Sequence, residues 1–210
     1  MIKATARRRQ AEREGRIASI LNAARTIFYR EGYAGTTIRK IAYEAELSQG
    51  AIYRFFNGID EIYAELLLDQ FKLIDTALEK GEAEGKSLVG KIKCIFRCYF
   101  EYYMDNPESY DLFIFSNAGW RRVGLRPEII AKLDRAIARS LSFIEAVISE
   151  GMKNGEIKQG SSAKTACLLW MAIEGIIVVH RRNLLENSGW DVRELVERQI
   201  DILLDGIMIR

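Results

Sequence analysis

Proline, histidine and cysteine are all scarce in this chain, and each shortage argues against a class of protein. Two prolines in 210 residues leave long uninterrupted segments, which favours helices. A single histidine argues against most acid–base catalysis, and no Walker loop, dinucleotide fingerprint or G-x-S-x-G motif is present. The three cysteines, Cys94, Cys98 and Cys167, are an odd number without the usual zinc spacing. We therefore expect no disulfide framework, no metal and no cofactor.

A membrane span and a secretory signal are also not expected. The most apolar stretch, residues 165–179, is 15 residues long and contains Glu174, whereas a bilayer requires about 20 apolar residues. Residues 1–16 are charged and lack the apolar segment of a signal peptide. These features, with the odd number of cysteines, predict a cytoplasmic protein without a membrane partner.

Charge is distributed unevenly along a chain whose net charge is only +2. Residues 1–57 hold 11 of the 31 Lys and Arg residues but 5 of the 29 Asp and Glu residues, which gives +6. The remaining residues hold 20 basic and 24 acidic side chains, which gives −4. A basic first part beside an acidic remainder indicates a nucleic-acid or membrane-surface partner for the basic part.

Apolar residues recur at spacings of three and four along nearly the whole chain, which predicts an all-α fold. No segment shows the strict alternation that a strand requires. Gly32 and Gly155 are expected to end helices, and Ser48 and Asp191 to cap the N-termini of others. The predicted helices cover residues 16–32, 38–45, 49–55, 57–81, 88–106, 111–120, 127–154, 163–185 and 191–207.

Two short predicted helices, residues 38–45 and 49–55, flank a tight turn, which is typical of a helix-turn-helix motif. In this motif the second helix enters the major groove with its N-terminal end towards the bases. There Gln49 can pair with an adenine edge, and the methyl group of Ala51 can meet a thymine methyl. The other candidate DNA contacts are Arg39, Lys40, Ser48, Gly50, Tyr53 and Arg54.

Residues 16–62 contain four patterns in order: IL-x-AA, F-x-x-x-GY, TTI-x-x-IA and S-x-G-x-[LI]-Y-x-x-F. In this order and at these separations they resemble the DNA-binding domain of the tetracycline-repressor (TetR) family. The resemblance implies that Thr37 and Tyr53 contact phosphates, whereas Arg39 and Gln49 lie where bases are read. It further implies an N-terminal arm and three-helix DNA-binding domain over residues 1–57, followed by a larger helical ligand-binding and dimerisation domain over residues 58–210.

The sequence departs from the family pattern at two positions. Glu46 stands in the turn where the family usually has glycine, and a glutamate adopts the positive φ of such a turn only at a cost. Ile59 stands where the family usually has a phosphate-binding lysine, so one anchoring charge is missing. The basic arm, with Lys3 and residues 7–9, is either a substitute for that charge or a solvated tail.

The second part of the chain contains candidates for an effector site. Aromatic residues spaced along a helix are found both in packed cores and in apolar ligand pockets, and the sequence leaves this choice open. Glu174, inside an apolar helix, needs a partner, which can be an arginine such as Arg97, a ligand or a dimer partner. The candidate ligand-binding residues are Phe96, Tyr99, Tyr103, Phe113, Phe143, Trp170 and Glu174.

The helix predicted over residues 163–185 is apolar on nearly every side, so one subunit is not expected to cover it. A two-fold dimer in which this helix and the last one pack against their own copies would cover it. The candidate interface residues are Ile176, Val196, Gln199, Leu203 and Ile207.

Together with the resemblance, these features predict a homodimeric repressor on double-stranded DNA. A small hydrophobic or amphipathic effector would release it from its operator, by favouring a conformation with the wrong spacing of recognition helices. Two alternatives remain: an enzyme or acyl carrier that uses a helical cavity, and a purely structural helical dimer. Duplex-DNA binding with a steep salt dependence distinguishes the regulator from both.

Overall fold

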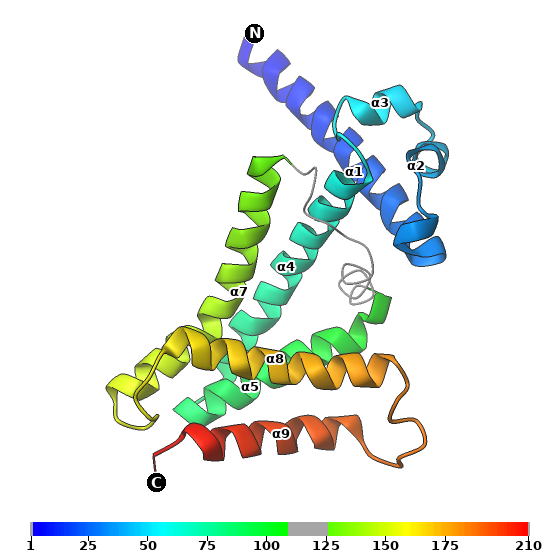
Figure 1. The fold of residues 1–210 in the computed structure, drawn as a ribbon. Helices are drawn as coiled ribbons and strands as arrows, with labels where there is room; N and C mark the ends of the chain where they lie inside the picture. The colour runs from blue at the N-terminus through cyan, green and yellow to red at the C-terminus, as the bar shows by residue number, and fades with distance from the viewer. Residues whose placement is uncertain (1, 109–125, 210) are drawn as a thin grey trace. The chain divides into compact units, whose positions relative to one another are not determined.

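The computed structural model describes residues 2–108 and 126–209, and these residues are almost entirely helical (Figure 1). The described ranges contain no strand, and one isolated bridge joins Ile157 to Met208. The all-α prediction is confirmed, while the helix predicted at 111–120 lies outside the described residues together with Phe113. The helices are α1 (Ile2–Gly35), α2 (Ile38–Glu44), α3 (Gln49–Tyr53), α4 (Ile59–Glu84), α5 (Leu88–Asp105), α7 (Pro127–Lys153), α8 (Ser162–Arg181) and α9 (Val192–Ile207).

The chain forms two compact units. Unit 1 comprises residues 1–70 and 108–133, and unit 2 comprises residues 71–107 and 134–210. Two of the three divisions fall inside helices, one within α4 and one within α7, and the third follows the end of α5. The predicted boundary after residue 57 separates a DNA-binding domain from an effector-binding domain, which is a division by function. It stays a prediction.

The core of unit 1 forms where the apolar faces of α1, α2, α3 and the start of α4 meet. Burial of these faces supplies most of the stability of helices as short as α2 and α3, which are marginal on their own. The rings of Phe28 and Tyr63 pack edge to face with centroids 5.2 Å apart, and Tyr33 lies beside both. The fully buried side chains of this core include Ile20, Ile27, Phe28, Ile41, Ile52, Ile62, Tyr63 and Leu66.

The first helix is longer than its sequence pattern predicts. It begins at Ile2, so the basic arm expected before residue 16 is itself helical. Gly32, with φ 68° and ψ 178°, breaks the regular helix where a stop was predicted, and one further turn reaches Gly35. The arm carries no apolar periodicity, because it lies beyond the core, and periodicity was the signal that marked the other helices.

In unit 2, α5, α8 and α9 pack together, and α8 and α9 run side by side in opposite directions (Figure 1). The end of α9 is fixed by the bridge, in which the Lys158 amide donates to the Ile207 carbonyl at 2.9 Å. The α9 face that packs inward is offset by one residue from the predicted stripe, because it also uses Ile200 and Leu204. The buried residues of these two helices are Ala166, Leu169, Ile173, Ile177, Val192, Val196, Ile200 and Leu204.

Gly81 does not end α4, as its sequence position suggested, but allows α4 to approach α5. A Cβ atom at this position would lie 2.5 Å from the Ile95 Cα atom. The helix therefore continues to Glu84, and the turn into α5 follows there. A glycine inside a helix can mark either a stop or a close approach, and the sequence does not distinguish the two.

Helix α8 is the one described helix long and apolar enough to cross a membrane by length and composition. At 20 residues it exceeds the 15-residue stretch on which the sequence argument against a span was based. Four of its residues are buried against its neighbours in unit 2, and much of its remaining apolar surface is open.

Candidate nucleic-acid interface

The turn between α2 and α3 keeps a left-handed backbone although a glutamate occupies it. Glu46 has φ 54°, and the Leu47 amide donates to the Ala42 carbonyl at 2.9 Å, which closes the turn. Glu46 therefore adopts the positive φ that was predicted to cost conformational free energy, and the turn keeps its shape. The turn fixes α3 relative to α2.

Helix α3 has one buried anchor, a half-buried Ala51 and three exposed residues. Ile52 is fully buried in the core of unit 1. Ser48 caps the helix as predicted, because its hydroxyl oxygen accepts from the Ala51 amide at 3.2 Å. Gln49 and Gly50 lie exposed in the first turn, and Arg54 follows the last turn, also exposed. Tyr53 is 54% exposed.

The predicted contacts on α2 are arranged around its N-terminus. Thr37 is the N-cap, because its hydroxyl oxygen accepts from the Lys40 amide at 3.2 Å. Arg39 is exposed, whereas the Lys40 ammonium group donates to the Gly35 carbonyl at 2.7 Å and to the Glu31 carboxylate. The Lys40 ammonium lowers the pKa of Glu31. Part of the Lys40 charge is therefore balanced within the protein.

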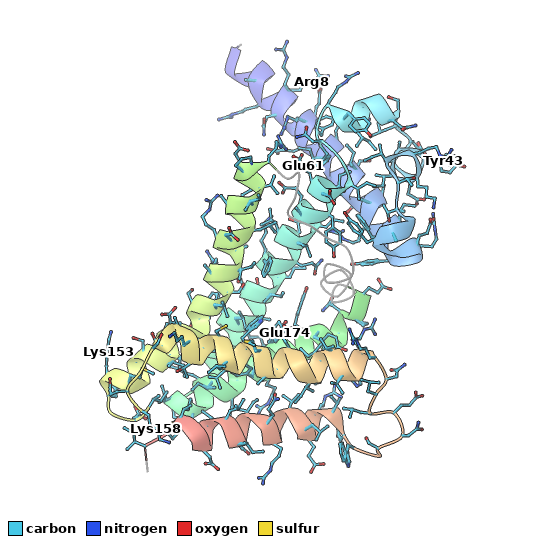
Figure 2. The ribbon with its side chains drawn as sticks, in the orientation of Figure 1. Arg8, Tyr43, Glu61, Lys153, Lys158 and Glu174 are labelled. Atoms are coloured by element: carbon cyan, nitrogen blue, oxygen red, sulfur yellow. The ribbon has the colours of Figure 1, made fainter. Side chains whose placement is uncertain are left out.

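Tyr43 was not singled out from the sequence, yet it is 87% exposed on the outer side of α2 (Figure 2). It follows Arg39 by one helical turn, and the two side chains with Lys40 line a surface hollow of about 230 Å³. The available signal was a large aromatic residue on the polar face of a short helix next to the turn.

A buried carboxylate fixes the start of α4 next to the motif. Glu61 is 2% exposed and accepts hydrogen bonds from the Asn57 amide and the Asn57 side chain, both at 3.0 Å. A third donor is Nε of Arg126, just before α7, at 2.6 Å. Ile59, where a lysine was expected, packs against the core of unit 1.

Tyr33 provides a second polar tie between α1 and α4. Its hydroxyl group donates to the Asp60 carboxylate in the first turn of α4. Burial of the phenol, together with the hydrogen bond to Asp60, raises the pKa of Tyr33. The tyrosine therefore stays protonated and able to donate throughout the neutral pH range.

In unit 2 the structure brings three of the predicted effector residues together. The Tyr99 hydroxyl donates to the carboxylate of Glu174, which is labelled in Figure 2. The Tyr99 and Trp170 rings lie 4.5 Å apart between centroids. The suggested Arg97 partner for Glu174 is wrong, because Arg97 instead pairs with Glu197 at 2.9 Å. Their separation along the chain, 75 residues, explains why the sequence did not identify Tyr99 as a partner.

The other predicted effector residues are more dispersed. Tyr103 is buried on α5 and packs edge-on towards His180, with ring centroids 6.3 Å apart. Phe96 is buried on the same helix, and Phe143 is half-buried on α7. The choice between core and pocket for these three stays open.

The predicted dimer residues differ in how much surface they offer. Val196 is 2% exposed within its own chain, so it supports α9 from inside and has no surface for a partner. The Gln199 side chain donates to the Ala172 carbonyl at 2.9 Å, which ties α9 to α8. The residues Ile176, Leu203 and Ile207 are half-buried. Large exposed apolar side chains that the sequence argument missed are Leu168, Met171 and Ile202.

Comparison with known proteins places these features in one group of regulators. The family model described as "Bacterial regulatory proteins, tetR family" matches residues 20–66, and "Tetracyclin repressor-like, C-terminal domain" matches residues 92–203. The "Fatty acid metabolism regulator protein" of Bacillus subtilis is 21% identical over 90% of this chain and 93% of its own length. The HTH-type transcriptional regulator TtgR of Pseudomonas putida is 25% identical over 97% of this chain and 96% of its own.

Solved structures share the fold. The transcriptional regulator FadR from Bacillus subtilis, in complex with stearoyl-CoA, superposes with a TM-score of 0.69 at 20% identity, over 90% of this chain and 98% of that one. A protein of unknown function from Rhodococcus sp. RHA1 gives a TM-score of 0.75 at 20% identity, over 92% and 96% of the two chains.

Proposed function

Because this chain belongs to the TetR family of bacterial transcriptional regulators, we propose that it is a repressor whose DNA binding a small amphipathic molecule relieves. The observation that carries the proposal is the exposed start of α3, held by the Ser48 cap and the buried Ile52. A short helix anchored by one apolar side chain, with its polar residues outward, suits insertion into a major groove.

The exposed residues divide into base-reading and phosphate-binding groups. Gln49 and Arg39 have the side chains that pair with adenine and guanine edges, while Gly50 and Ala51 are small enough for close approach of the backbone. Thr37, Tyr53 and Arg54 are assigned to phosphates. Lys40 is a further phosphate contact, weakened because Glu31 balances part of its charge. Ser48 contributes through the cap it makes.

The proposed repressor is a homodimer in the cytoplasm. The open apolar surface of α8 supports this assembly, since monomers rarely expose so much apolar area. A two-fold axis would cover each α8 and α9 with its own copy, through Ile176, Leu203 and Ile207 among others. It would also place two α3 helices about 34–36 Å apart, in successive major grooves.

For the effector we propose a molecule with a long acyl chain and a polar or charged head. The regulator of fatty acid metabolism and the structure holding stearoyl-CoA support this class. Within the chain, Tyr99 and Trp170 provide aromatic surface and Glu174 a polar group beside it. Phe96, Tyr103, Phe113 and Phe143 are the proposed apolar lining.

The test is selection of bound sequences from a random-sequence duplex pool, followed by release with defined compounds. We expect enrichment of a near-palindromic site, and loss of binding at micromolar stearoyl-CoA but not at equal coenzyme A. Release by coenzyme A alone would contradict the acyl chain as the recognised group. Failure to enrich any sequence would contradict the regulator and favour a purely structural dimer.

A further inference from the structure

The N-terminal part of α1 carries an arginine stripe, which we define as Arg9, Arg13 and Arg16. Spacings of four and three residues place these side chains on one face of the helix. The same face continues seven and fourteen residues beyond Arg13 as Ile20 and Ile27, which are fully buried. The inward face of α1 therefore changes from apolar to basic where the helix extends beyond the core, and there the arginines are exposed.

A contact fixes this stripe beside the recognition helix. The Arg13 guanidinium carbon lies 5.8 Å from the centroid of the Phe55 ring, a cation–π geometry. Phe55 comes two residues after Tyr53, the last residue of α3. Arg13, the middle residue of the stripe, therefore lies beside the C-terminal end of α3, and the whole stripe belongs to the unit that carries the proposed DNA contacts.

The two acidic residues of this segment are engaged elsewhere. Glu12 accepts from Arg8 at 3.0 Å, and Glu14 accepts from the Gln10 amide group at 2.7 Å. Both interactions are between residues four apart on the exposed helix, so they partly balance those carboxylates. The stripe itself presents three guanidinium groups over eight residues of helix, and the seven steps of about 1.5 Å between its ends give a length of about 10 Å.

We propose that the arginine stripe is a second DNA contact, which binds backbone phosphates of the duplex next to the half-site read by α3. This inference rests on the proposed function. Guanidinium groups bind phosphate in a bidentate manner, and a 10 Å stripe matches about three phosphate steps at 3.4 Å of helix axis each. Phosphate binding there would also supply charge that Ile59 does not provide at the start of α4.

The experiment compares two double variants of the full-length protein with equal charge loss. Arg9→Gln/Arg16→Gln removes the exposed ends of the stripe and keeps Arg13 against Phe55. Arg7→Gln/Arg8→Gln removes the same charge from other faces of the same turns. The probes are a 40-base-pair duplex recovered by selection with the unmodified protein and a random-sequence duplex of equal length. Affinities are measured from about 50 to 200 mM salt, with helicity checked by circular dichroism.

For Arg9→Gln/Arg16→Gln we expect a salt slope lower by about two per bound protomer and an affinity at least about tenfold weaker, on both duplexes. The Arg7→Gln/Arg8→Gln slope should change by less than one. Equal slopes for the two double variants, or an unchanged slope for the first, would overturn the stripe while leaving the regulator intact. Absence of duplex binding by the unmodified protein would overturn the proposed function itself, and the stripe with it.

Discussion

At the scale of single residues, Glu46 carries the strain in the helix-turn-helix motif. We predict that Glu46→Gly stabilises the protein by about 0.5 kcal/mol, because release of the left-handed strain outweighs the entropy that glycine adds to the unfolded chain. Operator affinity should rise as well, since a carboxylate leaves a turn that lies in the proposed DNA interface. Thermal unfolding and titration with the selected duplex measure the two effects.

Glu46→Gln is the matched control, because it removes the charge and keeps the backbone strain. It should strengthen DNA binding without raising the melting temperature. If neither variant binds the duplex more tightly, the carboxylate has no bearing on DNA affinity.

Replacement of Gln49 and of Arg54 by alanine should change DNA binding in different ways. Loss of a bidentate base contact at Gln49 is expected to relax preference at one base pair by about 1–3 kcal/mol. Loss of a phosphate contact at Arg54 should weaken all sequences alike and lower the salt slope by about one. Affinity measurements on a panel of single-base operator variants separate the two, and a uniform loss with Gln49→Ala would argue against base reading by that residue.

The sequence predicted the role of a residue where that role depends on interactions with residues a few positions away. The caps at Ser48 and Asp191 and the stop at Gly155 depend on neighbours within a few positions. Arg126, the distant partner of Glu61, lies 65 residues away, and Tyr99 lies 75 residues from Glu174, so only the fold could identify these two contacts. Lys40 shows the same limit, since its ion pair with Glu31, which the sequence did not identify, reduces the charge available for the proposed phosphate contact.

At the scale of secondary-structure elements, the packing of α4 against α5 gives a sharp test. Gly81→Ala should cost about 1–3 kcal/mol, because the new Cβ would meet backbone atoms of α5 at 2.5 Å and the helices must separate. Gly15→Ala on α1 is the control, since a Cβ there meets nothing within 4 Å. It should be neutral or stabilising by up to about 1 kcal/mol. Similar changes in urea-unfolding midpoints for both variants would contradict the close approach.

Apolar periodicity in the sequence predicted the helices that pack into a core. It did not predict the exposed start of α1, and it placed the buried face of α9 one residue off. Residues 2–15 form helix without an apolar stripe, and the inward face of α9 includes Ile200, one residue from the predicted Gln199. Such offsets arise because the apolar stripe of a helix is about three residues wide. The centre of the buried face is therefore fixed only by the helices that pack against it.

At the scale of the whole molecule, substitution of an exposed apolar residue on α8 tests the proposed dimer. Met171 is 61% exposed on α8, so Met171→Glu should leave each chain folded while placing two like charges in the proposed dimer interface. We expect dimer dissociation to be favoured at least about 100-fold, roughly 3 kcal/mol, with operator binding lost in parallel. Leu73→Glu on α4, also an exposed apolar position, is the control and should remain dimeric in sedimentation. A Met171→Glu protein that is still dimeric and bound to DNA would contradict this interface.

The strained turn also has a genetic consequence. Both codons for glutamate become glycine codons through one transition at the second base, so the family residue at position 46 is a single mutation away. A library made by error-prone amplification and screened for tighter silencing of a reporter should therefore return Glu46→Gly repeatedly and early. On the proposed function, position 46 would then let mutation change how tightly the repressor holds its operator without altering the residues proposed to read bases.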